Sequence, residues 1–108
     1  MERISDLTKL ILHRGLCESA VENSFSAFKS ACISPYVWGV ETDIQFTADG
    51  KCVCFHDKNG KRLLGLKTLI HDFKFEQLKH LKIVNSKQSI SAPICPFKKY
   101  VKICKKYN

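Results

Sequence analysis

The sequence predicts a single α/β domain, and three observations support this prediction. The first half alternates between strand-like and helix-like patterns in the order strand, helix, strand, which is the usual start of a parallel sheet with a right-handed crossover. The 108 residues suffice for one hydrophobic core but not for two. Hydrophobic residues make up 44% and charged residues 26%, with five Gly and three Pro, which excludes a disordered or collagen-like chain. We therefore treat residues 1–108 as one domain.

The first strand and the first helix follow each other closely. Residues 9–12 form a short apolar run closed by His-Arg-Gly at 13–15, a pattern typical of a buried strand that ends in a loop. A helix is predicted over residues 25–32, because Asn23 or Ser24 can cap it. Its apolar stripe has helical spacing and consists of Phe25, Phe28 and Cys32.

A long strand and a hairpin are predicted next. Residues 38–46 alternate strictly, so Val40, Thr42, Ile44 and Phe46 should face one way and Glu41, Asp43 and Gln45 the other. The Asp-Gly pair within residues 48–51 is a hairpin signal, and residues 52–56 form the second arm. The polar, Gly-containing segment 57–67 is predicted to be a loop.

The second half is predicted to be helical. Residues 75–83 have apolar positions at helical spacing, residues 85–92 form a polar linker, and residues 97–107 form an amphipathic helix. The apolar stripe of the last helix consists of Phe97, Tyr100, Val101 and Cys104.

Two carboxylates and two histidines are the candidate chemical groups. Glu41 and Asp43 lie two residues apart on a strand, which separates their Cα atoms by about 7 Å and points both side chains to one face. This pair is either a site for a hard cation such as Mg²⁺ or Ca²⁺, or the solvent face of a half-exposed strand. His13 and His56 each end an apolar strand, where ligands bind in parallel sheets, and imidazoles can act as acid and base near neutral pH.

A soft-metal site formed by Cys52, Cys54 and His56 is an alternative on the same hairpin. The spacing is not that of a zinc knuckle, and three consecutive ligands on one strand face seldom surround one ion. We therefore favour buried lining residues at these positions.

The net charge of +8 is unevenly distributed along the chain. Residues 1–56 carry five basic and seven acidic residues, whereas residues 57–108 carry thirteen basic and three acidic ones. The five lysines of the last helix are typical of a solvated helix face. Because no recognised nucleic-acid module is present, we expect no nucleic-acid partner, and binding through these lysines ranks last among the candidate functions.

The cellular compartment is inferred from three features. No apolar run approaches the roughly 18 to 20 residues that a membrane span needs. The first nine residues lack the apolar stretch of a secretory signal. The six cysteines are therefore expected to be free thiols in a reducing compartment, the cytoplasm, rather than a disulfide framework.

Four motifs, in order along the chain, resemble the glycerophosphodiester phosphodiesterase family. They are His-Arg-Gly at 13–15, Glu-Asn-Ser at 22–24 followed by Ala27 and Phe28, the run from Gly39 to Gly50, and Val-Cys-Phe-His-Asp at 53–57. The clear resemblance covers residues 10–57. It implies a TIM barrel, a Ca²⁺ or Mg²⁺ ion, and hydrolysis of a glycerophosphodiester to sn-glycerol 3-phosphate and an alcohol.

The resemblance also implies a role for individual residues. Glu41 and Asp43 would be metal ligands, His13 and His56 would be the acid–base pair, and Arg14 would contact the substrate phosphate. Glu22 would line the site beside them. The resemblance does not say which histidine is the acid.

The length of the chain limits what this resemblance implies. A TIM barrel takes about 250 residues, so we expect the N-terminal portion of a barrel with three strands, truncated before the barrel can close. Exposed strand edges would favour self-association or a second chain that completes the barrel. Two functions remain open: a phosphodiester hydrolase, whose activity in this chain alone is doubtful, and a non-catalytic remnant that binds a phosphorylated ligand or partner.

Overall fold

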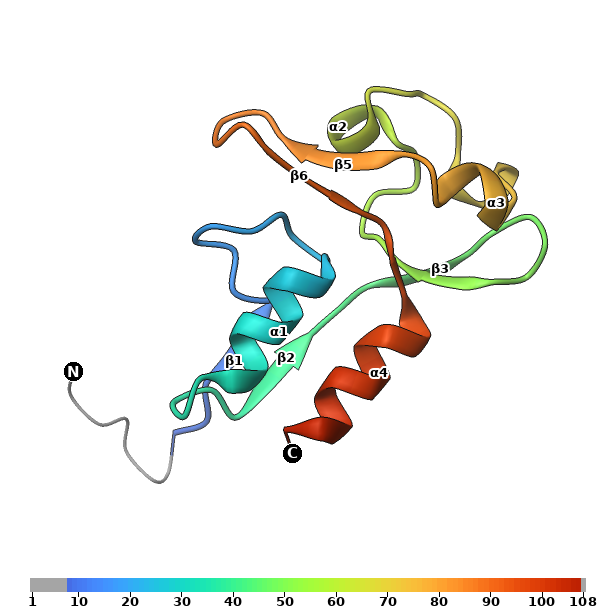
Figure 1. The fold of residues 1–108 in the computed structure, drawn as a ribbon. Coiled ribbons are helices and arrows are strands. Elements are labelled where there is room, and N and C mark those ends of the chain that lie inside the picture. Colours follow the sequence, from blue (N-terminus) through green and yellow to red (C-terminus); the bar gives the residue numbers. More distant parts are fainter. Residues whose placement is uncertain (1–7, 108) are drawn as a thin grey trace.

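The computed structural model describes residues 8–107, and Figure 1 shows an α/β arrangement of short elements. In chain order they are β1 (Ile11–His13), α1 (Phe25–Ile33), β2 (Gly39–Glu41), β3 (Ile44–Phe46), β4 (Cys52–Cys54), α2 (Lys61–Leu64), the 3-10 helix η1 (Ile70–Asp72), α3 (Phe75–Leu78), β5 (Lys82–Asn85), β6 (Ile90–Pro93), β7 (Cys95–Pro96) and α4 (Phe97–Lys106). The start in the order strand, helix, strand is confirmed, because β1 pairs in parallel with β2 across the α1 connection.

The predicted strand over residues 38–46 is wrong as a single element. β2 pairs in parallel with β1, whereas β3 pairs antiparallel with β4, so the chain changes sheets at Thr42 and Asp43. The predicted alternation holds within β3, but the predicted common face does not continue from β2, where Val40 packs against buried side chains. Ile44 and Phe46 are exposed, while the Gln45 amide donates hydrogen bonds to the carbonyls of Phe55 and Asp57 at 3.0 and 2.5 Å.

Only two of the three predicted strands therefore run parallel within residues 8–107. The hairpin predicted at the Asp-Gly pair is present between β3 and β4, and β4 pairs on its other side with β7, again antiparallel. β4 ends at Cys54, so His56 lies two residues beyond the strand rather than at its end.

Three predictions for the second half are wrong. The loop predicted over residues 57–67 contains α2. The helix predicted over residues 75–83 ends at Leu78. Lys82, Ile83 and Val84 belong instead to β5, where they alternate between exposed and buried positions. The polar linker predicted over residues 85–92 contains most of β6, which forms a hairpin with β5.

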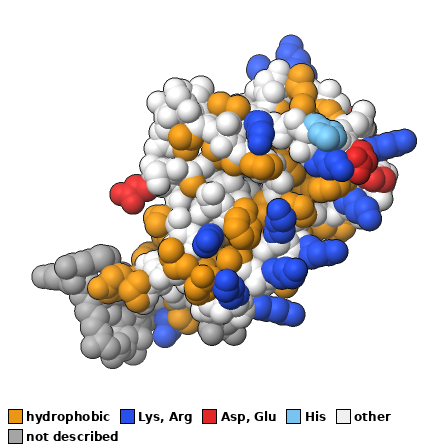
Figure 2. Space-filling model, viewed as in Figure 1, with side chains coloured by type: hydrophobic (Ala, Val, Ile, Leu, Met, Phe, Trp, Pro, Cys, Tyr) orange, Lys and Arg blue, Asp and Glu red, His pale blue; other side chains and the backbone are white. Residues whose placement is uncertain are grey.

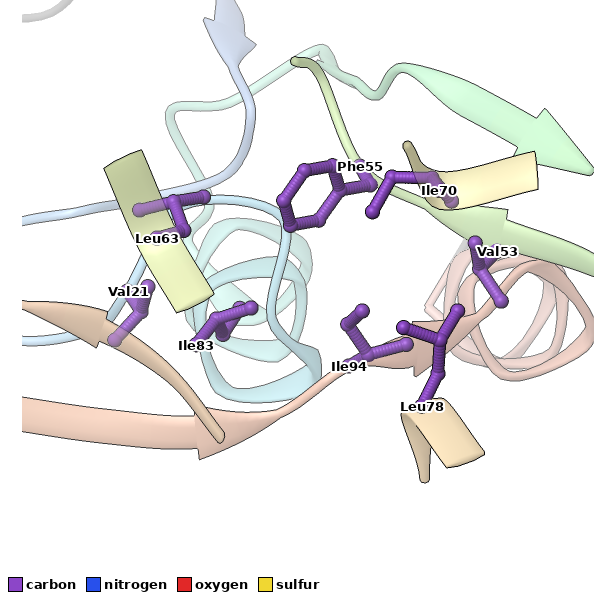
Figure 3. Close-up of a cluster of buried hydrophobic side chains, with 8 residues drawn as sticks. All are labelled: Val21, Val53, Phe55, Leu63, Ile70, Leu78, Ile83 and Ile94. Atoms are coloured by element: carbon purple, nitrogen blue, oxygen red, sulfur yellow. The ribbon is translucent and has the colours of Figure 1, made fainter. Parts of the chain in front are cut away.

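Two clusters of buried side chains hold these elements together. The larger consists of Val21, Val53, Phe55, Leu63, Ile70, Leu78, Ile83 and Ile94. Figure 3 shows the Phe55 ring between Leu63 on one side and Ile70 on the other. The smaller cluster consists of Phe28, Cys54, Cys95 and Ile103, and it packs α1 and α4 against β4 and β7.

The last helix matches its prediction closely. α4 covers residues 97–106, and the Tyr100 ring meets that of Phe28 on α1 edge-to-face, with ring centroids 4.8 Å apart. Its most deeply buried residue is Ile103, which the predicted stripe did not include. Basic side chains spread over the face of the molecule where α4 lies in Figure 1, with hydrophobic side chains exposed among them (Figure 2). Between residues 8 and 107 no helix is long and apolar enough to cross a bilayer.

Candidate active site

The carboxyl ends of β1 and β2 bring three of the predicted site residues together. His13 and Glu41 are register partners in this parallel pair, and His13 Nε2 lies 3.8 Å from Glu41 Oε1. The backbone N–H of Arg14 donates to the carbonyl of Glu41 at 3.0 Å and also approaches Glu41 Oε1 at 3.3 Å. The His13 imidazole and the Glu41 carboxylate thus meet at one edge of the sheet, beside the Arg14 backbone.

A tight turn directs Arg14 into this site. Arg14 has a φ of +61° and Gly15 a φ of +96°, so two consecutive residues adopt left-handed conformations. Position 15 accepts only glycine, because a Cβ there would lie 2.7 Å from the Cβ of Ala27 on α1. Strain of this kind concentrates at functional sites, where the surrounding packing maintains it.

Asn23 is a site residue whose role the sequence did not indicate. It is buried, with a φ of +55°, and its backbone N–H donates to the Arg14 carbonyl at 2.9 Å. Its side-chain amide donates to Asp43 Oδ2 at 3.2 Å and accepts from the Thr42 hydroxyl at 2.8 Å. The cap of α1 is instead Ser24, whose hydroxyl accepts from the Ala27 N–H. The signal was present, since Asn23 belongs to one of the four motifs.

The Arg14 guanidinium faces carboxylates on two sides. Its Nη1 donates to Glu22 Oε2 at 3.0 Å, and its Nε lies 3.5 Å from Asp43 Oδ2. That Nε is buried and lacks a hydrogen-bond acceptor among the described residues. Nη2 likewise has no partner among residues 8–107, which leaves this donor available to an anion.

A second arginine, Arg62 on α2, connects the remaining site residues. It donates to Glu22 through two bonds of 2.8 Å and to Asp57 through bonds of 2.9 and 3.1 Å. Asp57 Oδ1 in turn lies 2.8 Å from His56 Nδ1. The sequence pattern indicated no role for Asp57 or Arg62, although Asp57 directly follows His56 in a motif.

These contacts set the charge state of the two carboxylates. The Arg62 hydrogen bonds lower the pKa of Asp57 to about 2, with His56 contributing in the same direction. The same guanidinium lowers the pKa of Glu22, and both carboxylates in return raise the pKa of Arg62. Glu22 is therefore more than a lining residue, because it bridges Arg14 and Arg62.

The two candidate acid–base histidines lie at opposite ends of this network. No direct contact joins His13 to His56 among the described residues; the connection runs through Glu41, Arg14, Glu22, Arg62 and Asp57. Both imidazoles are accessible to a ligand, with 67% and 45% of their side-chain surface exposed.

Glu41 and Asp43 are the residues that could hold a metal ion. Their side chains are partly exposed, at 40% and 24%, and each has one oxygen without a hydrogen-bond partner in the described range. No cluster of three or more His, Cys, Asp or Glu suitable for a metal occurs in residues 8–107, the Cys52, Cys54 and His56 set included. Carboxylate oxygens are the hard donors that both Mg²⁺ and Ca²⁺ bind, and two carboxylates would need water or other oxygens to complete the coordination of either ion.

A hollow of about 440 Å³ lies beside Arg14. His13, Arg14, Glu22 and Arg62 line one side of it, and Asn85, Ser86 and Lys87 at the β5–β6 turn line another. The turn falls in the segment predicted to be a linker, so this wall of the site was missed.

Comparison with known proteins identifies relatives of this chain. Residues 13–106 match the model of the glycerophosphoryl diester phosphodiesterase family. A glycerophosphodiester phosphodiesterase of Bacillus altitudinis is 37% identical over 73 residues, which cover 68% of this chain and 29% of that protein. The human glycerophosphodiester phosphodiesterase 1 is 37% identical over 76 residues, covering 70% of this chain and 23% of that protein.

Solved structures agree with these relatives. The glycerophosphodiester phosphodiesterase of Thermotoga maritima is 32% identical with a TM-score of 0.71, covering 88% of this chain and 38% of that one. A phosphodiesterase of Oleispira antarctica, solved in complex with the product sn-glycerol-3-phosphate, is 25% identical with a TM-score of 0.78 and covers 93% of this chain and 41% of that one. The chain thus spans less than a third of these sequence relatives and about two fifths of these structures.

Proposed function

The chain belongs to the glycerophosphoryl diester phosphodiesterase family, and from that premise we propose that its site binds a glycerophosphodiester and takes part in its metal-dependent hydrolysis to sn-glycerol 3-phosphate and an alcohol. The observation that carries this proposal is the register of His13 with Glu41 at the carboxyl ends of β1 and β2. It puts a proton-transfer group, a carboxylate and the Arg14 guanidinium at one place, where a phosphodiester has both an anion to bind and a proton to exchange.

The fold proposal follows from the same strand pair. We take β1 and β2 as two adjacent strands of a TIM barrel, with α1 as the helix between them. In such barrels active sites lie at the carboxyl ends of the strands, which is where His13 and Glu41 lie. The chain then forms the N-terminal portion of the barrel.

Arg14 binds the substrate phosphate in this proposal. Its Nη2 donates to a phosphate oxygen, while Glu22 and Asp43 hold the rest of the guanidinium in place. Glu41 and Asp43 are the residues that would hold a Mg²⁺ or Ca²⁺ ion, and such an ion would supply positive charge against the phosphoryl group.

His13 and His56 move the protons. One accepts a proton from the attacking water, whose oxygen bonds to phosphorus, and the other donates a proton to the alkoxide that leaves as the alcohol. Asp57 holds His56 for this task, because a carboxylate only accepts hydrogen bonds and so fixes the proton on Nδ1. His56 Nε2 then remains the nitrogen that faces substrate.

The test is release of sn-glycerol 3-phosphate from glycerophosphodiesters with Mg²⁺ or Ca²⁺, and after metal removal by chelation. The matched variants are His13→Ala, His56→Ala and, as a control, His80→Ala, whose exposed histidine lies outside the site. We expect turnover only with metal, a fall of at least about 100-fold in either site variant, and no change in the control.

Binding is measured in parallel by titration calorimetry with sn-glycerol 3-phosphate. The chain could bind sn-glycerol 3-phosphate without turning over the diester. If Arg14→Gln abolished that binding, the phosphate site would be confirmed and the chain would be assigned to the non-catalytic alternative. The proposal would be overturned if the chain showed no turnover and no binding although circular dichroism shows it to be folded.

A further inference from the structure

Two cysteines far apart in the sequence face each other across the packed pair of helices α1 and α4. Cys32 lies near the end of α1 and Cys104 near the end of α4, and their sulfur atoms are 4.0 Å apart. The helices pack firmly here, since the rings of Phe28 and Tyr100 are in edge-to-face contact. The two thiols are therefore held near each other by the fold.

The pair is also open to small molecules. Cys32 and Cys104 line a hollow of about 260 Å³ whose wall includes Trp38 and Tyr107. Both aromatic side chains are exposed at the surface, Trp38 at 65% and Tyr107 at 41%. A reagent of a few non-hydrogen atoms can enter this hollow and reach either sulfur.

A second cysteine pair in the same region provides a contrast. Cys54 and Cys95 are register partners on β4 and β7, but they are 0% and 2% exposed and belong to the buried cluster with Phe28 and Ile103. No reagent reaches them without unfolding. Within each pair the two cysteines are neighbours, but only the Cys32–Cys104 pair is accessible to a reagent.

We propose that Cys32 and Cys104 are a modification site at which a low-molecular-weight disulfide oxidises the two thiols to a disulfide joining α1 to α4. This proposal does not depend on the hydrolase activity, because neither cysteine touches the residues around Arg14. The bond would join two residues that are 72 positions apart in the sequence, and it would fix α4, the last described helix, onto α1.

The reaction proceeds in two exchange steps. The thiolate of one cysteine attacks a sulfur of the reagent, forming a mixed disulfide and releasing one reagent thiolate. The second cysteine, after losing its proton to solvent, attacks the protein sulfur of that mixed disulfide and releases the other reagent thiolate. Two protein thiols are oxidised and one reagent disulfide is reduced to two thiols. The sulfurs, now 4.0 Å apart, must approach by roughly 2 Å to reach the bond length of about 2.05 Å.

The environment of Cys32 slows any exchange step in which its thiolate is the attacking group. Burial, followed by the neighbouring Cys104, raises the pKa of Cys32 to about 11. Because the thiolate is the attacking species, the reaction should be slow at neutral pH and is best followed at pH 8.5 over hours.

The test treats the reduced, folded 108-residue chain with 2-hydroxyethyl disulfide, then unfolds it in urea with N-ethylmaleimide present so that the buried thiols are also blocked, and measures intact mass and tryptic peptides. We expect four alkylated cysteines and a cross-linked peptide pair containing residues 32 and 104. Cys32→Ser and Cys104→Ser should abolish the cross-link, whereas the control variants Cys17→Ser and Cys52→Ser should retain it. The oxidised chain should melt on the order of 10 °C higher than the reduced chain, and the melting of Cys32→Ser should not respond to the reagent.

Several results would overturn the proposal. One is a mixed disulfide with the reagent at residue 32 or 104 that never converts to the protein disulfide, and another is a cross-link between other cysteines. A third is a folded chain that keeps all six thiols free under oxidising conditions that do cross-link the chain unfolded in urea. A cross-link that forms without any rise in melting temperature would refute the fixing of α4.

Discussion

Replacing Arg62 with methionine removes the guanidinium that two carboxylates share while retaining an unbranched side chain of similar length. Arg62 donates two bonds each to Glu22 and Asp57, and the side chains of these partners are only 16% and 25% exposed. In the variant both carboxylates stay charged at neutral pH without this partner. We therefore expect the variant to be destabilised, and by an amount that depends on pH.

The magnitude follows from Asp57. The Arg62 hydrogen bonds lower its pKa from 3.8 to about 2, and a difference of about 2 units corresponds to roughly 2.5 kcal/mol. Because 47% of the Arg62 side chain is exposed, solvent screening reduces this to about 1 kcal/mol. The lowered pKa of Glu22 adds a contribution of the same sign.

The pH dependence has a definite sign. A carboxylate whose pKa is lowered by folding stabilises the native state above its unfolded pKa, near 4, and this stabilisation is lost as the pH falls toward 2. The chain with Arg62 should therefore lose stability more steeply between pH 5 and 2 than Arg62→Met does. At pH 7 the two differ by at least about 1 kcal/mol, and near pH 2 the difference should become small.

The assay is urea unfolding followed by far-ultraviolet circular dichroism at pH 7, 5, 3 and 2. Lys61→Met is the matched control, since Lys61 is the exposed neighbour on the same helix and its side chain forms no ion pair among the described residues. Equal acid sensitivity in Arg62→Met and the unsubstituted chain would refute the assigned role of Arg62. A control variant as destabilised as Arg62→Met would attribute the effect to α2 in general.

Two further predictions concern packing. Gly15→Ala should destabilise the chain by at least about 2 kcal/mol in the same unfolding assay, because the turn has a φ of +96° and the added Cβ would lie 2.7 Å from that of Ala27; an unchanged midpoint would show that α1 can shift. Phe46→Ser should reduce self-association of the chain in light scattering after size-exclusion chromatography, because Phe46 is 58% exposed beside the 46% exposed Ile44. A chain that is monomeric at all concentrations before substitution would contradict this second prediction.

The elements that the sequence predicted correctly are those whose pattern depends on local physics. Ser24 caps α1 through its own hydroxyl, and the Asp-Gly pair turns the chain between β3 and β4 whatever the strands pair with. α4 is strongly amphipathic over ten residues, and its lysines and apolar side chains need no further partner to define a helix. Such signals are contained in windows of a few residues.

The errors arise where pairing partners decide the structure. Residues 38–46 alternate like one strand, but alternation does not record that Val40 pairs with β1 while Ile44 pairs with β4. The apolar residues Phe75, Leu78 and Leu81 are compatible with a helix, yet Ile83 is required in a strand because β6 is there to pair with it. The polar residues 85–89 that precede β6 made the whole segment resemble a linker, and the hairpin with β5 makes residues 90–93 a strand.

The same distinction separates the site residues that were found from those that were missed. His13 and Glu41 end two paired parallel strands, and Arg14 and Asp43 follow them within two residues, so this pairing suffices to bring the four together. Arg62 lies 40 residues from Glu22 in sequence, in a segment that composition alone predicts to be a loop. Yet this guanidinium holds Asp57, and Asp57 holds the ring of His56. The motifs alone therefore identify the groups proposed to exchange protons but omit the group that orients one of them. For this reason the Arg62 substitution tests the structure more stringently than any change to the histidines themselves.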